Sequence, residues 1–115
     1  MKKDPQVLLD HNLDCINHIN AYTKAVSKGT FLKTDQIQDA VFRRIEIIGE
    51  AAGKLPQEFR DANPKIPWKE IIGTRNVLIH DYVEVDKELV WGIVEKHIPD
   101  LEKEIKKLSK KEKKI

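Results

Sequence analysis

The sequence predicts an all-α protein, an antiparallel bundle of four main helices with one short extra helical turn. Apolar residues recur at steps of three and four along most of the 115 residues, whereas the alternation typical of strands is hard to find. Proline, glycine and capping residues divide the chain into segments of helical length. Because the links between these segments are short, consecutive helices are expected to lie antiparallel.

The first helix is expected to run from Asp4 or Pro5 to Lys28 and to be closed by Gly29. Proline suits the first turn of a helix, and glycine often follows the last residue. This helix would bury an apolar stripe that consists of Leu9, Leu13, Ile16, Ile19, Tyr22 and Val26.

The second helix is expected to begin at Thr34 or Asp35, both good N-caps, and to stop at Gly53. Its buried stripe consists of Ile37, Val41, Ile45, Ile48 and Ala52. A short helical turn is expected within residues 56–63, because proline favours its start and an asparagine before a proline disfavours its continuation. Phe59 would anchor this turn.

The last two main helices are expected to run from Pro67 or Trp68 to about His80 and from Asp86, as N-cap, toward the end of the chain. The final apolar stripe consists of Val90, Val94, Ile98, Leu101, Ile105 and Leu108. Pro99 interrupts this stripe, so a kink or a brief break is expected there.

Length and composition predict one domain over residues 1–108 and a basic tail at 109–115. With 40% hydrophobic and 35% charged residues, the chain can form a single modest core. The last 13 residues carry seven lysines and two glutamates, a charge of +5, so the other 102 residues carry −3. Such a tail can attract nucleic acid, but we favour the reading in which lysines complement a helix C-terminus and aid solubility.

The composition also predicts a cytoplasmic protein with no membrane segment. One cysteine, Cys15, excludes an intrachain disulfide, and the first residues lack the apolar segment of a secretory signal. The longest apolar run, at residues 89–94, is far shorter than the roughly 20 residues that a membrane-spanning helix needs.

Residues 73–82, GTRNVLIHDY, place several polar side chains in an otherwise apolar stretch. Arg75 and His80 would differ by about 140° around a helix, so the long arginine would have to reach toward the histidine at the helix end. Gly73 costs about 1 kcal/mol of helix propensity relative to alanine, which indicates either close approach of a helix or phosphate, or a tolerated packing glycine. Asp81 is expected to face water rather than to orient His80.

An arginine and a histidine together suit cleavage of a phosphodiester. Arginine offers a permanent charge for phosphate oxygens, and histidine can take and give a proton near neutral pH. In RNA the 2′-hydroxyl is an internal nucleophile, so neither a metal nor a cofactor is required. The spacing alone is weak support, because a histidine at a helix end is more often a cap.

The segment RNVLIHDY, with Arg75, His80 and Tyr82, resembles the ribonuclease motif of HEPN proteins, specifically of HepT-like toxins of the HepT/MntA type. Other parts of the chain that resemble this family are RRIEIIGEAAGKLP at 43–56, IPWKEIIGTRN at 66–76, Val85-Asp86 and Trp91. The resemblance covers nearly the whole domain.

This resemblance implies a metal-independent endoribonuclease toxin of a type VII toxin-antitoxin pair, a symmetric homodimer in which two motifs meet at the two-fold axis. By that likeness Arg75 would hold the scissile phosphate, His80 would act as general acid or base, and Asn76 would position the substrate, tRNA or messenger RNA. Tyr82 would receive AMP from an MNT-type nucleotidyltransferase antitoxin, and the added phosphates would repel RNA. The alternative is that Tyr82 is a half-buried aromatic residue whose hydroxyl forms a hydrogen bond with a nearby group.

Two further functional readings stay open. The chain could be a non-catalytic helical module that binds a nucleotidyltransferase or a nucleotide, or a purely structural dimer. Cleavage of RNA that depends on His80 separates the enzyme from both, and a co-purifying partner separates the module from the structural dimer.

One further set of residues could hold a metal. His11, Asp14 and His18 recur on the first helix at steps of three and four, with Cys15 beside them. Because a tight site normally needs a further ligand and supporting residues, a solvated helix face is the preferred reading.

Two more sets allow a functional and a structural reading. Arg43, Glu46 and Glu50 could line a cleft, but surface ion pairs are favoured. Trp68 and Trp91 could stack on bases, but at the starts of amphipathic helices they are expected in the core.

Overall fold

The computed structural model describes residues 4–80 and 85–113, so Asp81 and Tyr82 lie outside the described residues. Within these two ranges the chain is helical and contains no strand, as expected. The helices, in chain order, are α1 Pro5–Thr23, α2 Lys28–Lys33, α3 Asp35–Lys54, α4 Gln57–Ala62, α5 Trp68–His80, α6 Lys87–Gly92, the π-helix η2 Ile93–His97 and α7 Ile98–Lys113. None of them is long and apolar enough to cross a membrane.

The first helix is shorter than expected. α1 ends at Thr23 rather than Lys28, because Ala25 takes the left-handed backbone conformation with φ of 60°. Ser27 then caps a new helix, α2, by accepting a hydrogen bond from the Thr30 backbone N–H at 3.1 Å. Gly29 lies inside α2 and does not close α1, so the expected boundary was wrong.

The break after α1 brings an aromatic side chain into the core. Phe31 in α2 is fully buried and lies 5.2 Å, between ring centroids, from Trp91 in α6. The Gln38 side-chain amide donates to the Phe31 carbonyl at 2.8 Å, which ties α2 to α3. Trp68 is also buried, so both tryptophans are core residues and neither is free to stack on a base.

The second helix and the short turn follow the expectation closely. α3 begins at Asp35 and ends at Lys54, one residue beyond the predicted stop at Gly53. α4 fills the predicted turn, and Phe59 packs against the core. The Trp68 indole N–H donates to the Asn63 carbonyl at 3.0 Å and connects the end of this turn to α5.

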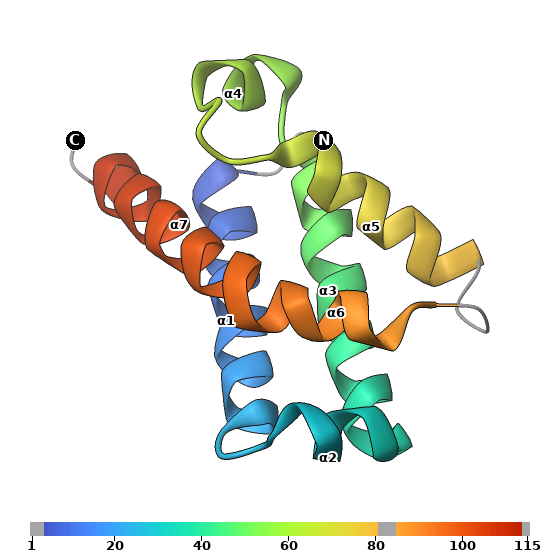
Figure 1. Cartoon of the computed structure of the whole chain (residues 1–115). Helices are drawn as coiled ribbons and strands as arrows, with labels where there is room; N and C mark the ends of the chain where they lie inside the picture. Colours follow the sequence, from blue (N-terminus) through green and yellow to red (C-terminus); the bar gives the residue numbers. More distant parts are fainter. Residues whose placement is uncertain (1–3, 81–84, 114–115) are drawn as a thin grey trace.

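Pro99 does not break the last helix. Asp86 caps α6 by accepting from the backbone N–H groups of Glu88 at 3.0 Å and Leu89 at 3.2 Å. The π turn of η2 lies just before Pro99, which has no N–H to donate, and the helix continues as α7. The helical path changes direction in this region (Figure 1). α7 runs on to Lys113 through most of the predicted basic tail.

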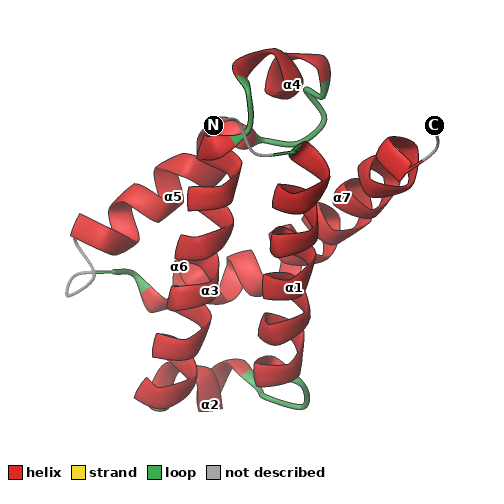
Figure 2. Cartoon of the chain, turned by 180° about the vertical axis from the view of Figure 1, so that it is seen from behind, coloured by secondary structure: helices red, strands yellow, loops and turns green. Residues whose placement is uncertain are grey.

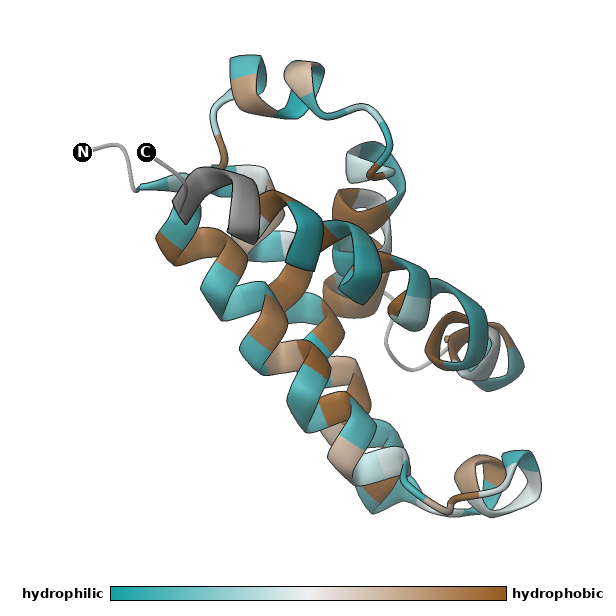
Figure 3. Ribbon diagram, turned by 90° about the vertical axis from the view of Figure 1, so that its left-hand side faces the viewer, coloured by the Kyte–Doolittle hydropathy of each residue, from teal (hydrophilic) through white to brown (hydrophobic). Residues whose placement is uncertain are grey.

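α3 is the central helix. It lies between α1 and α5 in both opposite views (Figures 1 and 2), and α7 packs on α1. Hydrophobic and hydrophilic residues alternate along the helices at helical intervals (Figure 3), as expected when each helix buries one face. Fully buried residues include Leu9, Ile16, Ile19, Val41, Leu78 and Ile105 in these helices and Leu55 just after the end of α3.

We expect Phe31→Ala to destabilise the protein by about 3–5 kcal/mol, because it empties a fully enclosed site between α2, α3 and α6. Urea unfolding followed by circular dichroism measures this change. Val7→Ala is the control, because Val7 is 43% exposed. Equal unfolding midpoints for the two variants would contradict the packing described for α2.

Candidate functional site

The polar motif lies on α5, which crosses α3 at a glycine. Gly49 of α3 is buried, and a Cβ atom built on it would overlap the Arg75 Cβ and lie 3.0 Å from both the Arg75 Cγ and the Ile71 carbonyl oxygen. The stem of Arg75 therefore leaves α5 directly against the backbone of α3. This close approach is made possible by the missing side chain at position 49.

The head of Arg75 turns away from this contact. Its Nη1 donates a hydrogen bond to the Asn76 Oδ1 at 2.9 Å, while its Nε is buried without a hydrogen-bond partner among the described residues. Asn76 lies about 100° around α5 from Arg75, on the side of His80, from which it is only about 40° away. The guanidinium is thus drawn toward the face that carries the histidine.

His80 is the last residue of α5 and is exposed. No hydrogen bond or ion pair joins it to Arg75 or Asn76 within the part of the chain that is described. Asp81 and Tyr82 are outside that part, so their roles stay predictions. The structure therefore brings Arg75 and Asn76 together, and it leaves His80 open to a substrate or a second subunit.

The close contact expected at Gly73 occurs at Gly49 instead. Nothing in the described chain lies within 4 Å of a Cβ built on Gly73, so a neighbouring helix does not require a glycine there. Sequence reasoning missed Gly49, although a glycine beside the buried stripe of a strongly amphipathic helix was the available signal. An intrahelical glycine weakens the helix by about 1 kcal/mol, which a close contact can compensate, but Gly73 shows that such a glycine does not always mark one.

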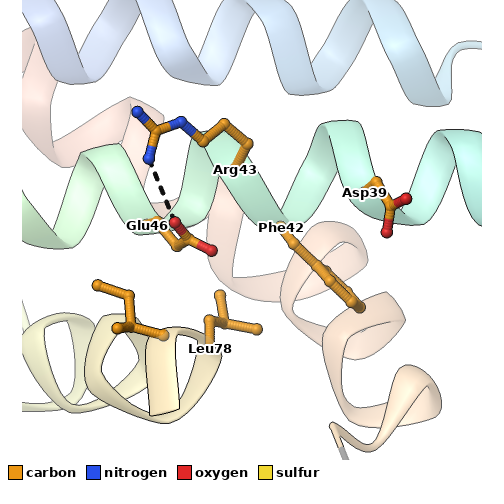
Figure 4. Close-up of a pocket in the computed structure, with 6 residues that line it drawn as sticks. Asp39, Phe42, Arg43, Glu46 and Leu78 are labelled. Atoms are coloured by element: carbon orange, nitrogen blue, oxygen red, sulfur yellow. Dashed lines mark hydrogen bonds and ion pairs between the residues drawn. The ribbon is translucent and has the colours of Figure 1, made fainter. Parts of the chain in front are cut away.

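A groove of about 290 Å³ runs along the seam between α3 and α5 (Figure 4). Its lining residues are Asp39, Phe42, Arg43, Glu46, Leu78 and Ile79. Arg43 Nη1 and Glu46 Oε2 are 3.3 Å apart, so these two residues form the expected ion pair and also line a groove. Glu50 pairs with Lys54 at 3.5 Å, away from the groove lining.

A larger groove of about 520 Å³ separates α5 from the α6–α7 path. Its walls are largely apolar and include Ile71, Ile93 and Leu101, with Glu70 and Asp100 also in the lining. Leu89, at 65% exposure, contributes to the same surface. α5 is therefore packed closely on α3 but much less closely on the last helices.

The residues considered as metal ligands on α1 do not share one environment. His18 Nε2 and Asp14 Oδ2 are 3.6 Å apart on the solvent side, and His11 is exposed, whereas Cys15 is buried. Over the described residues, no group of three or more histidine, cysteine or acidic residues is arranged to hold a metal ion. The positions of these residues fit the interpretation that His11, Asp14 and His18 belong to a solvated face of α1.

Cys15 has the environment of a structural residue. Burial raises the pKa of its thiol, and the nearby Arg44 guanidinium offsets only part of this effect. A hydrogen bond to Tyr22, and secondly one to Cys15, raises the pKa of Arg44 in turn. Because the thiol stays protonated near neutral pH, it is a poor nucleophile and a poor metal ligand.

Comparison with known proteins gives a consistent result. Residues 12–108 match the family model described as "Ribonuclease HepT-like". The chain is 41% identical over 111 residues to a protein of Caldanaerobacter subterraneus subsp. tengcongensis named "Putative RNase", a match that covers 96% of this chain and 99% of that protein. It is 36% identical over 110 residues to the "Probable ribonuclease HepT" of Thermococcus cleftensis, with 96% and 100% covered.

Another relative is about twice as long as this chain. It is the "Gamma-glutamylcyclotransferase and putative RNase" of Methanocaldococcus jannaschii, which is 47% identical over 108 residues. This match covers 94% of the chain but only 49% of that relative. No solved structure matches the chain.

Proposed function

The chain belongs to the HepT-like ribonuclease family, and on this premise we propose that it is a metal-independent endoribonuclease that cleaves RNA by transesterification. The observation that carries the proposal is the hydrogen bond from Arg75 to Asn76, which draws the guanidinium toward the helix face of His80. Arginine and histidine on one accessible surface are the two groups that this reaction needs.

In the proposed reaction the 2′-oxygen of a nucleotide attacks the adjacent phosphorus. The O2′–P bond forms and the P–O5′ bond breaks, which leaves a 2′,3′-cyclic phosphate and a 5′-hydroxyl. A proton leaves the 2′-hydroxyl and another reaches the departing 5′-oxygen, with His80 as a donor or acceptor. Arg75 stabilises charge on the non-bridging oxygens, and each of these contributions is worth about 10²- to 10⁴-fold in rate.

Asn76 has two roles in this proposal. Its Oδ1 accepts the hydrogen bond from Arg75, and its side-chain amide N–H groups have no partner among the described residues, so they can donate to RNA. A guanidinium already held by a neighbour also loses less freedom when it binds phosphate. Asn76 therefore orients both the arginine and the substrate.

We further propose that the active form is a symmetric homodimer of HEPN-like antiparallel four-helix bundles, with α1, α3, α5 and the α6–α7 path as the main helices. Large apolar side chains are exposed on and beside α5, namely Val77 at 51%, Ile79 at 39% and Leu89 at 65%. Ile79 and Leu89 lie in different grooves, whereas Val77 lies only about 60° around α5 from His80. An exposed apolar residue beside a polar site favours a protein contact there. A two-fold axis at α5 would supply a second His80, so that one histidine could act as base and the other as acid.

In the proposed toxin-antitoxin pair, RNA cleavage is regulated by modification of Tyr82. An MNT-type nucleotidyltransferase would join the tyrosine oxygen to the α-phosphorus of ATP and release pyrophosphate. The AMP group would place negative charge two residues after His80, where it repels the RNA backbone. The proposed enzyme would act in the cytoplasm, on tRNA or messenger RNA.

The central experiment incubates the purified protein with labelled tRNA or messenger RNA in EDTA. We expect wild-type cleavage that leaves cyclic phosphate ends, and a loss of about 100-fold or more in Arg75→Ala and His80→Ala. His80→Ala should keep the wild-type melting temperature because His80 is exposed. His11→Ala is the matched control, since His11 is also an exposed helical histidine.

Other results of this experiment separate the alternatives. If wild-type protein cleaves nothing with EDTA or with divalent cations, yet co-purifies with a nucleotidyltransferase, the chain is a non-catalytic module. If it shows neither property, it is a structural protein. Cleavage that survives both substitutions would refute the assigned residues.

The dimer is tested by Val77→Asp. Burying an unpaired carboxylate in an apolar interface is strongly unfavourable, so we expect this variant to be monomeric and inactive. Light scattering after size-exclusion chromatography measures the mass, and Val7→Asp on α1 is the control because Val7 is exposed to a similar degree, 43%. A dimeric Val77→Asp protein, or a monomeric wild type, would disprove this interface.

Modification of Tyr82 is tested with an MNT-type nucleotidyltransferase, ATP and magnesium. We expect mass spectrometry to detect added AMP on wild type and on Tyr22→Phe, but not on Tyr82→Phe, together with loss of RNA cleavage in the modified proteins. Tyr22 is the control because it is half-buried and lies on another helix, α1. AMP on Tyr82→Phe would assign the site elsewhere, and an unmodified wild type would disprove the switch.

A further inference from the structure

Gly49 differs from the other glycines of the chain in what surrounds it. A Cβ built on Gly53, Gly73 or Gly92 would meet nothing within 4 Å among the described residues, and one on Gly29 would come no closer than 3.9 Å to a side chain. At Gly49 the same atom would overlap the Arg75 Cβ. The steric requirement for glycine is therefore specific to the position that faces the candidate phosphate-binding arginine.

The contact involves the stem of the arginine as well as the helix backbone. The added atom would lie 3.0 Å from the Arg75 Cγ and 3.0 Å from the Ile71 carbonyl oxygen. A methyl group could be accommodated only if α5 moved away from α3 or if Arg75 left its rotamer. Either change moves the guanidinium, because the whole side chain beyond Cγ follows.

Two further features of Arg75 restrict the direction in which its stem can point. The Arg75 Nε is buried in the seam without a hydrogen-bond partner among the described residues, and Nη1 is held by Asn76 at 2.9 Å. The side chain is thus limited at its base by α3 and at its head by Asn76. A displaced stem would not satisfy both contacts at once.

We propose that Gly49 is a positioning residue for the RNA cleavage proposed above. Its missing side chain lets the Arg75 stem lie flat against α3, and this sets where the guanidinium meets the phosphate. Gly49 does not touch RNA and acts only through Arg75. The inference rests on the proposed function and extends it to a residue outside the motif.

The first test compares Gly49→Ala with Gly53→Ala, a glycine on the same helix that faces open space. We expect Gly49→Ala to lower kcat by about 10- to 100-fold with a smaller change in KM, because a shift of the order of 1 Å misplaces a group that stabilises the transition state. Gly53→Ala should leave both constants nearly unchanged. Equal kinetics for the two variants would overturn the proposal.

The second test removes the arginine and supplies its head group in solution. Arg75→Gly is assayed with added guanidinium ions, alone and combined with Gly49→Ala. Free guanidinium does not depend on a stem that passes over α3, so the rescued rates should be equal with glycine or alanine at position 49. A lower rescued rate with alanine would show that Gly49 acts by another route and would refute the proposal.

The double variant also covers the case in which Gly49→Ala alone does not fold. Glycine at position 75 removes the Cβ and Cγ atoms that a methyl at position 49 would meet, so that only the contact of 3.0 Å with the Ile71 carbonyl oxygen is left, which a shift of a few tenths of an ångström relieves. The comparison of guanidinium-rescued rates between the double variant and Arg75→Gly then tests, as in the preceding experiment, whether Gly49 acts through Arg75.

A spectroscopic readout separates this inference from the proposed function. In an NMR spectrum of wild type, the buried Arg75 Nε–H should give a resonance that shifts in Gly49→Ala and not in Gly53→Ala. If wild type cleaves no RNA but this shift occurs, the proposed function fails while Gly49 still positions Arg75. An unchanged resonance in Gly49→Ala disproves the positioning, whatever the activity.

Discussion

The contact between α3 and α5 at Gly49 determines where the polar groups of this chain can lie. Hydrophobic burial favours closeness between two helices but does not fix their distance, whereas the repulsion between atoms in contact does. With no side chain at position 49, that limit is set by Arg75 and by the Ile71 carbonyl oxygen. α1 packs on α3 as well, so the helix that carries this limit is itself held in place.

α5 combines a packed side with an accessible side. Leu78 is buried toward α3, whereas Asn76, Val77 and His80 are exposed. Polar groups suited to RNA and an apolar residue suited to a second subunit therefore occupy the same short helix. In the proposed dimer, assembly and catalysis would use one surface, and activity would depend on protein concentration by mass action.

Most of the fold could be predicted from periodicity and capping, because both are local properties of the sequence. The start of α6 follows from the Asp86 side chain, which caps the helix. The start of α3 was also predicted, although its N-cap residue Thr34 makes no side-chain capping hydrogen bond. The end of α1 could not be predicted as well, since Ala25 gives no sign of a left-handed backbone and only Ser27 marks the new start. The role of Gly49 depends on which helix lies opposite, and helical periodicity carries no such information.

The site was predictable to the extent that its residues are close in sequence. The hydrogen bond from Arg75 to Asn76 turns the guanidinium toward the neighbouring face of α5, because a long side chain can cross to it. No described hydrogen bond joins it to His80, so the meeting of these two groups stays a prediction.

The π turn of η2, Ile93–His97, has a different consequence, which concerns insertions and deletions. Val90, Val94 and Ile98 are four residues apart and all three are buried, so the apolar stripe stays on the core side as the chain passes through the wider turn from α6 to α7. Because a π turn holds one residue more than an α turn, a homologous chain that lacks one residue here is expected to form a continuous α-helix and to keep its C-terminal helix in the same rotational position.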